Sequence, residues 1–125
     1  MTYVRLNVNP KGRATDDCVV RAFSVASGRT WEQTLTDLFN ISMRLKVMPN
    51  AIAAYQLYAK DLGFTRCKVV VVDGHRPTVA SFAKANPTGV YILRCANHLT
   101  VVVDGAYKDT YDCGGKSVYM YWKAG

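Results

Sequence analysis

The apolar pattern of this 125-residue chain changes its period near Cys67. Before this point apolar side chains recur at helical spacing, and after it they form short β-branched runs between polar breaks. Helices followed by strands favour an α+β domain, in which N-terminal helices pack on one side of a C-terminal antiparallel sheet. The length fits one domain, and no repeat or linker interrupts residues 1–125.

Three helices are expected in the first half of the chain, after an extended entry segment. The stretch "TDDCVVRAFSVASG" predicts a buried helix that Thr15 or Asp16 caps and that ends at Gly28. A second helix is expected over residues 30–46, because "TWEQ" at its start is a Thr-x-x-Gln capping box. A third is expected over residues 49–63, between a proline and a glycine.

The second half is expected to form a sheet with one short helix, which Thr78 can cap and Pro87 stops. Strands are expected at residues 67–73, 90–94, 98–104, 106–112 and 117–122. Asp104-Gly105 is the strongest local hairpin signal in the chain, so the strands on either side of it should pair through a two-residue turn.

The charge of the chain is positive but not clustered. Sixteen basic and nine acidic residues give a net charge of +7, which attracts acidic partners at long range. The basic residues form no run, stripe or recognisable binding motif, so weak and non-specific contact with nucleic acid is the most that the charge implies.

The apolar stretches are too short for a membrane-spanning segment, which needs roughly 20 residues. The N-terminus lacks the apolar core of a secretory signal, so a cytoplasmic location is expected. Cys18, Cys67, Cys95 and Cys113 are then expected to be reduced rather than joined in disulfides.

One cysteine and one histidine are candidates for chemistry. Cys18 lies in the first turn of the predicted buried helix, where free N–H groups and the helix dipole favour a thiolate. The alternative is that Cys18 simply fills the core, as most buried cysteines do. His98 opens a strand on its less apolar face and can reach a cleft, whereas His75 lies in a predicted loop and is expected to be solvated.

The register of the hairpin decides which acid can orient His98. A two-residue turn at Asp104-Gly105 pairs Thr100 with Asp109 and puts that carboxylate diagonal to His98 on one face. A three-residue turn shifts the register by one and puts Asp112 opposite His98 instead. Asp-Gly favours the first arrangement, and Asp112 remains the alternative.

The segments "NPKGRATDDCVVRAFSVASG" and "NHLTVVVDGAYKDTYDC" together resemble papain-like cysteine peptidases, and most closely a group of small, uncharacterised phage-encoded proteins of that type. The resemblance implies that Cys18 is the nucleophile, His98 the general base and acid, and Asp109 or Asp112 the orienting group. Papain-like enzymes usually carry an oxyanion-hole glutamine six residues before the cysteine, where this chain has Gly12. Asn9 is the nearest replacement, although it can equally start a turn with Pro10.

The remaining cysteines have two competing interpretations, as zinc ligands or as structural residues. Cys95 and His98, with Cys113 and either Cys67 or Cys18, could hold zinc, but structural zinc sites usually bring two short-spaced ligand pairs. No metal or cofactor is therefore expected. Cys67 and Cys95 are expected in the core, and Cys113 in an exposed turn.

Arg21 follows Cys18 by one helical turn on an otherwise apolar helix, so its guanidinium needs a partner. The simpler expectation is a salt bridge to Asp16 or Asp17. The alternative is recognition of a substrate carboxylate.

The function expected from these residues is a papain-like thiol hydrolase that acts on a peptide or amide bond by acyl transfer through a Cys-His-Asp triad. Its partner would be a protein or peptide substrate, from the host or the phage if the resemblance holds. Peptidase, deamidase and transglutaminase activities remain open, because the same triad performs each. The alternative is a non-catalytic protein of the same fold, either a phage inhibitor of a host protein or a basic nucleic-acid-binding accessory.

Overall fold

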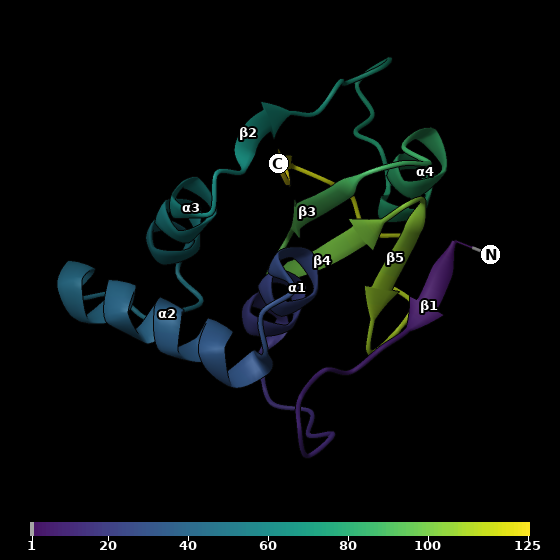
Figure 1. The fold of residues 1–125 in the computed structure, drawn as a ribbon. Coiled ribbons are helices and arrows are strands. Elements are labelled where there is room, and N and C mark those ends of the chain that lie inside the picture. The colour runs from purple at the N-terminus through teal and green to yellow at the C-terminus, as the bar shows by residue number, and fades with distance from the viewer. Residues whose placement is uncertain (1) are drawn as a thin grey trace.

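The computed structural model of the chain describes residues 2–125, in which four helices accompany one six-stranded sheet (Figure 1). The helices are α1 (Cys18–Ser27), α2 (Trp31–Leu45), α3 (Ile52–Asp61) and α4 (Val79–Ala85). The strands are β1 (Tyr3–Arg5), β2 (Thr65–Lys68), β3 (Val90–Cys95), β4 (His98–Val103), β5 (Ala106–Asp109) and β6 (Met120–Lys123). The expected α+β class is confirmed, with helices first and most strands afterwards.

The strand order of the sheet is β1-β5-β4-β3-β6-β2. All neighbours pair antiparallel, as expected, except β1, which lies parallel to β5 with Tyr3 opposite Tyr107. The N-terminal segment was expected only to be extended. Its parallel pairing depends on a crossover through the whole helical half, which no local pattern encodes.

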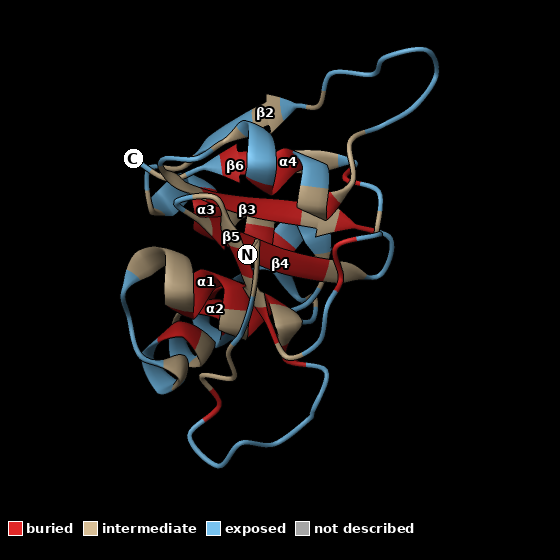
Figure 2. Ribbon diagram, turned by 90° about the vertical axis from the view of Figure 1, so that its right-hand side faces the viewer, coloured by how far each residue is buried: buried red, intermediate tan, exposed pale blue. Residues whose placement is uncertain are grey.

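Helices cover both faces of the sheet: the three N-terminal helices lie on one side, as expected, but the short helix α4 does not join them. Helices α1, α2 and α3 pack on one face, whereas α4 packs on the other, against a second apolar cluster (Figure 2). Along β3, Ile92 belongs to the first cluster while Tyr91 and Leu93 belong to the second, and all three side chains are buried. A strand that is apolar on both faces needs cover on both.

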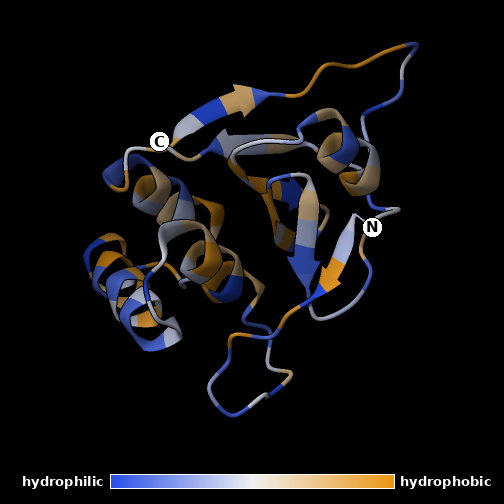
Figure 3. Ribbon diagram, turned by 45° about the vertical axis from the view of Figure 1, so that its right-hand side comes forward, coloured by the Kyte–Doolittle hydropathy of each residue, from blue (hydrophilic) through white to orange (hydrophobic). Residues whose placement is uncertain are grey.

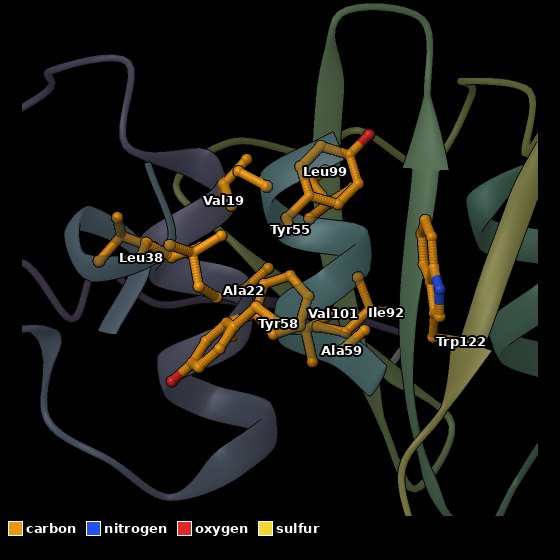
Figure 4. Close-up of a cluster of buried hydrophobic side chains, with 14 residues drawn as sticks. Val19, Ala22, Leu38, Tyr55, Tyr58, Ala59, Ile92, Leu99, Val101 and Trp122 are labelled. Carbon is orange, nitrogen blue, oxygen red and sulfur yellow. The ribbon is translucent and has the colours of Figure 1, made fainter. Parts of the chain in front are cut away.

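The larger core lies between the first three helices and the sheet (Figure 4). Phe23 of α1 and Leu38 of α2 are completely buried in it, and the ring of Tyr55 meets Trp122 edge to face at 5.7 Å between centroids. This packing fixes α1 against β4, and therefore places the N-terminus of α1 beside the start of β4.

Three of the expected helix ends are confirmed. Gly28 ends α1 in the left-handed conformation, Thr30 and Gln33 form the capping box of α2, and Thr78 caps α4 with Ser81. The expected cap of α1 is wrong, because Asp17 precedes its first residue and makes no side-chain cap hydrogen bond.

The run of valines at residues 69–72 does not belong to the sheet, although a strand was expected over residues 67–73. Strand β2 ends at Lys68, and Val70, Val71 and Val72 are 76%, 51% and 63% exposed. Figure 3 shows this segment, here named the valine arm (residues 69–72), as an orange stretch that projects from the molecule after β2. A β-branched run predicts strand conformation, but it cannot supply a partner strand.

The last two expected strands are also shorter than the pattern predicted. Strand β5 ends at Asp109, and β6 begins only at Met120. Among residues 2–125, no helix combines the length and the apolar character that crossing a bilayer requires.

Candidate active site

The β4–β5 hairpin brings His98 and Asp109 together. Val103 pairs with Ala106, and both turn residues, Asp104 and Gly105, have positive φ, which is the backbone of a two-residue turn. The expected register is therefore the observed one. His98 Nε2 lies 2.6 Å from Asp109 Oδ2, and only 7% of the His98 side chain is exposed.

Asp112 does not take part in this contact. Its carboxylate accepts hydrogen bonds from the Tyr107 hydroxyl and, at 2.9 Å, from the backbone N–H of Gly114. Asp112 thus fastens the turn after β5, as a residue of the "DCGG" stretch can, and the acid that touches His98 is Asp109.

Cys18 is the first residue of α1 and is partly buried. Burial raises the pKa of its thiol, but hydrogen bonds from His98 and from the backbone N–H of Leu99 outweigh burial, and the pKa is lowered. Because Asp109 already engages His98 Nε2, the nitrogen left for the thiol is Nδ1. The imidazole of His98 therefore lies between the thiol of Cys18 and the carboxylate of Asp109.

The ionised forms of Cys18, His98 and Asp109 stabilise one another. Burial alone lowers the pKa of His98, but its bonds to Asp109, Cys113 and Cys18 outweigh burial and raise the pKa to about 12. Burial raises the pKa of Asp109, but its bonds to His98 and Arg21 hold that pKa far below the ordinary value. The imidazole is consequently held protonated and the carboxylate ionised, which favours a thiolate at Cys18.

Arg21 connects α1 to the same carboxylate. Its Nε lies 2.8 Å from Asp17 Oδ1, which is one of the two expected salt bridges, and its Nη1 lies 2.9 Å from Asp109 Oδ1. Trp31 Nε1 donates to the other oxygen of Asp17 at 2.9 Å. The contact with Asp109 was not predicted, although an arginine on an apolar helix signalled the need for a partner.

Asn9 initiates the turn before α1. Its Oδ1 accepts from the Lys11 N–H at 3.0 Å, its backbone oxygen accepts from the Gly12 N–H at 2.9 Å, and its Nδ2 donates to Asp17 at 3.3 Å. The amide that an oxyanion role would require is thus engaged by Asp17. Gly12 has φ +63°, so this position suits the turn and offers no side-chain donor.

A cavity of about 460 Å³ opens beside Cys18 and His98. Its lining includes Tyr55 and three polar residues that were not singled out from the sequence, Asn50, Arg94 and Asn97. They come from the loop before α3, from α3, from β3 and from the β3–β4 turn. No local pattern marks them, because only the tertiary fold brings these segments to the mouth of α1.

Two of the four cysteines, Cys67 and Cys113, are placed differently from expectation. Cys95 is buried, as expected, but Cys67 on the edge strand β2 is only partly buried. Cys113 was expected to be exposed and is 2% exposed, because its turn is folded against the start of α4 through the Ala80 N–H to Gly114 O bond. The expectation that His75 is solvated is confirmed.

The donor atoms of His98, Asp109 and Cys113 all lie within 4.8 Å of one another, so among residues 2–125 these are the side chains that could hold a metal ion. The set shares His98 and Cys113 with the predicted zinc ligands, but it includes Asp109 and lacks Cys95, Cys67 and Cys18. The guanidinium of Arg21 is bound to the same carboxylate, and its positive charge opposes a cation there.

Comparison of the chain with protein-family models, with curated proteins and with solved structures gave no match. The papain-like resemblance stays a prediction that rests on the residues quoted for it. The fold described above is a mixed α+β fold.

Proposed function

We propose that this protein is a cysteine hydrolase that cleaves a peptide or amide bond by acyl transfer through Cys18. The observation that carries the proposal is that Cys18 and His98 line the same cavity of about 460 Å³, while the His98 imidazole bonds the Asp109 carboxylate. A nucleophile needs a raised thiolate fraction, a proton donor within reach and a group that orients this donor.

In the first step, the Cys18 thiolate attacks the carbonyl carbon of the scissile bond. The carbonyl oxygen becomes an oxyanion, to which the backbone N–H of Cys18, in the first turn of α1, can donate. The proton on His98 Nδ1 is transferred to the leaving nitrogen as the C–N bond breaks. The products of this step are a free amine and a thioester on Cys18.

In the second step, the now neutral His98 removes a proton from water, and the resulting hydroxide attacks the thioester. The C–S bond breaks, the carboxylic acid is released, and Cys18 returns to the thiolate beside a protonated imidazole. Asp109 orients the ring and stabilises its charge throughout, and Arg21 in turn holds Asp109 in place.

The papain-like resemblance adds a substrate class to this proposal, namely a protein or peptide. If the leaving nitrogen is that of a side-chain amide, the same two steps deamidate glutamine. If an amine replaces water in the second step, they form a new amide bond. The geometry of the triad is common to all three reactions.

A second candidate is a non-catalytic binding protein of the same fold, and the position of Asn9 favours it. With Asn9 committed to Asp17 and glycine at position 12, the loop before Cys18 gives the oxyanion no side-chain donor. Removal of one such donor lowers kcat by about 10² to 10³ in a known hydrolase.

The test of the proposal is alkylation of the purified protein with iodoacetamide between pH 4 and pH 9, with each adduct mapped by mass spectrometry. Cys18 is expected to react well below the pH range of an ordinary thiol. In the His98→Ala variant, the reaction of Cys18 is expected to move to higher pH. Cys67, which is partly exposed and lies on β2, is the internal reference.

Two results would count against the hydrolase. One is alkylation of Cys18 and Cys67 with the same pH profile, and the other is a Cys18 profile that does not change in His98→Ala. Either would leave the binding protein as the better hypothesis, because the thiol would have no activating partner.

A further inference from the structure

The cavity beside Cys18 holds a cationic side chain that the protein itself does not neutralise. Arg94 lines the cavity from β3, and within residues 2–125 its guanidinium forms no ion pair with any carboxylate. The other arginine near the site, Arg21, is paired with two aspartates. Arg94 is therefore the charged group that a ligand in this cavity can still engage.

Tyr55 lies beside Arg94 and completes a pair of donors. Its ring packs edge to face on Trp122, and Figure 4 shows its hydroxyl directed away from that packed cluster. Tyr55 and Arg94 line the same cavity, and burial raises the pKa of Tyr55 while the guanidinium of Arg94 opposes this rise. The phenol thus stays neutral and able to donate a hydrogen bond.

The sheet register places Arg94 near the nucleophile. Arg94 pairs with Leu99 across β3 and β4, and both residues line the same cavity as Cys18. The thiolate and the imidazolium of His98 offset each other, which leaves Arg94 and the exposed Asp16 as the remaining charges of the lining. Asp16 belongs to the loop before α1 and does not pair with Arg94.

We propose that Arg94 and the hydroxyl of Tyr55 form an anion subsite that binds a carboxylate of the substrate next to the bond attacked by Cys18. This inference rests on the proposed function and names its substrate class, which is an acyl compound with a carboxylate close to the scissile carbonyl. In a peptide, that carboxylate is either the side chain of an acidic residue or the C-terminal carboxylate.

The test compares chloroacetyl probes, whose chloride the Cys18 sulfur displaces as the C–S bond forms. Chloroacetyl-glycine and chloroacetyl-glycinamide differ only in a terminal carboxylate, and chloroacetyl-glutamic α-amide and chloroacetyl-glutamine amide differ only in a side-chain carboxylate. Rates are measured by mass spectrometry at one pH, so the ratio within each pair does not depend on the thiol pKa. The pair with the larger ratio identifies the source of the carboxylate.

In at least one pair, the carboxylate probe is expected to react with Cys18 about fivefold to tenfold faster than its amide partner, as a charge-assisted hydrogen bond would allow. The Arg94→Gln variant is expected to lose this ratio, and Tyr55→Phe to reduce it. Arg66→Gln is the matched control, because Arg66 is an exposed arginine on the edge strand β2 and the change in net charge is the same. This control is expected to keep the ratio.

Equal rates for both members of each pair would overturn the subsite, and so would a ratio that Arg94→Gln leaves unchanged. If Arg94→Gln does not fold, Arg94→Lys is the second variant, because it keeps the positive charge but loses the planar, bidentate guanidinium. It is expected to retain part of the preference for the carboxylate probe. Failure of the subsite is distinct from failure of the hydrolase. Neutral iodoacetamide reports on the activation of Cys18, whereas the paired probes report on Arg94.

Discussion

At the residue scale, the site depends on a set of interacting charged groups, which includes His98, Asp109 and Arg21, rather than on the thiol of Cys18 alone. Asp109 is 1% exposed and accepts from His98 on one oxygen and from Arg21 on the other. The sequence predicted the cysteine, the histidine and the acid from chain position and hairpin register. It did not predict that Arg21 bonds Asp109, because a contact between residues 88 apart depends on how α1 packs on the sheet.

Replacing this acid tests the ion pair through stability. The pKa of Asp109 is lowered by folding, so its contribution is present above the unfolded value of about 4 and is lost as the pH falls below it. The pKa of His98 is raised by folding to about 12, so its contribution is complete below the unfolded value of about 6.5 and is lost as the pH rises. The pair therefore stabilises the fold most between about pH 4 and pH 6.5.

We expect Asp109→Asn to lower the free energy of unfolding at pH 5.5 by about 3–5 kcal/mol, because it breaks a buried pair and leaves His98 without its carboxylate. The variant should also lose most of the pH dependence on either side of this range. Urea unfolding from pH 3 to pH 9 measures both effects. Asp112→Asn, which removes an acid that does not touch His98, should keep the loss of stability above about pH 6.5, and identical profiles for wild type and Asp109→Asn would contradict the role of the pair.

At the scale of single elements, the signals that proved reliable are those with a local mechanism. The capping box at Thr30, the glycine after α1 and the Asp-Gly turn each satisfy backbone geometry within four residues. The predictions that failed are those that depend on a partner strand. The valine arm forms no strand of the sheet, and the parallel pairing of β1 was not predicted.

The two left-handed helix ends give a matched test of local conformation. Gly28 ends α1 at φ +74° and Lys46 ends α2 at φ +60°, and a Cβ at Gly28 would meet nothing within 4 Å. Gly28→Ala should therefore destabilise through backbone strain alone, by about 1 kcal/mol, and Lys46→Gly should stabilise by a similar amount. Urea unfolding of both variants at one pH checks the opposite signs, and two changes of the same sign would show that contacts rather than φ decide these ends.

At the scale of the whole molecule, the sheet is a central layer with helices on both faces, and apolar side chains are not confined to the core. The valine arm exposes three consecutive β-branched residues, and the chain carries +7 without a basic stripe in its sequence. Hydropathy alone therefore cannot separate core from surface here. The position of a valine relative to the two apolar clusters decides what it contributes to stability.

A pair of identical substitutions tests this distinction. Val70 is 76% exposed on the valine arm and Val101 is 1% exposed on β4. Val101→Thr puts a hydroxyl into the core and should lower the free energy of unfolding by about 1–3 kcal/mol, whereas Val70→Thr should change it by less than about 0.5 kcal/mol. Urea unfolding measures both, and a loss at Val70 as large as at Val101 would mean that the arm is packed in solution.

The sequence by itself determined the class of the fold and most helix ends, and it favoured the β4–β5 register in which Asp109 rather than Asp112 reaches His98. All of these depend on interactions between residues close together in the chain, where periodicity, capping and turn geometry act. The tertiary structure alone decided the parallel partner of β1, the second helical face, the burial of Cys113 and the cavity with Arg94. These depend on which distant segments meet, and such contacts form through packing of the whole chain, for which a local pattern has no signal.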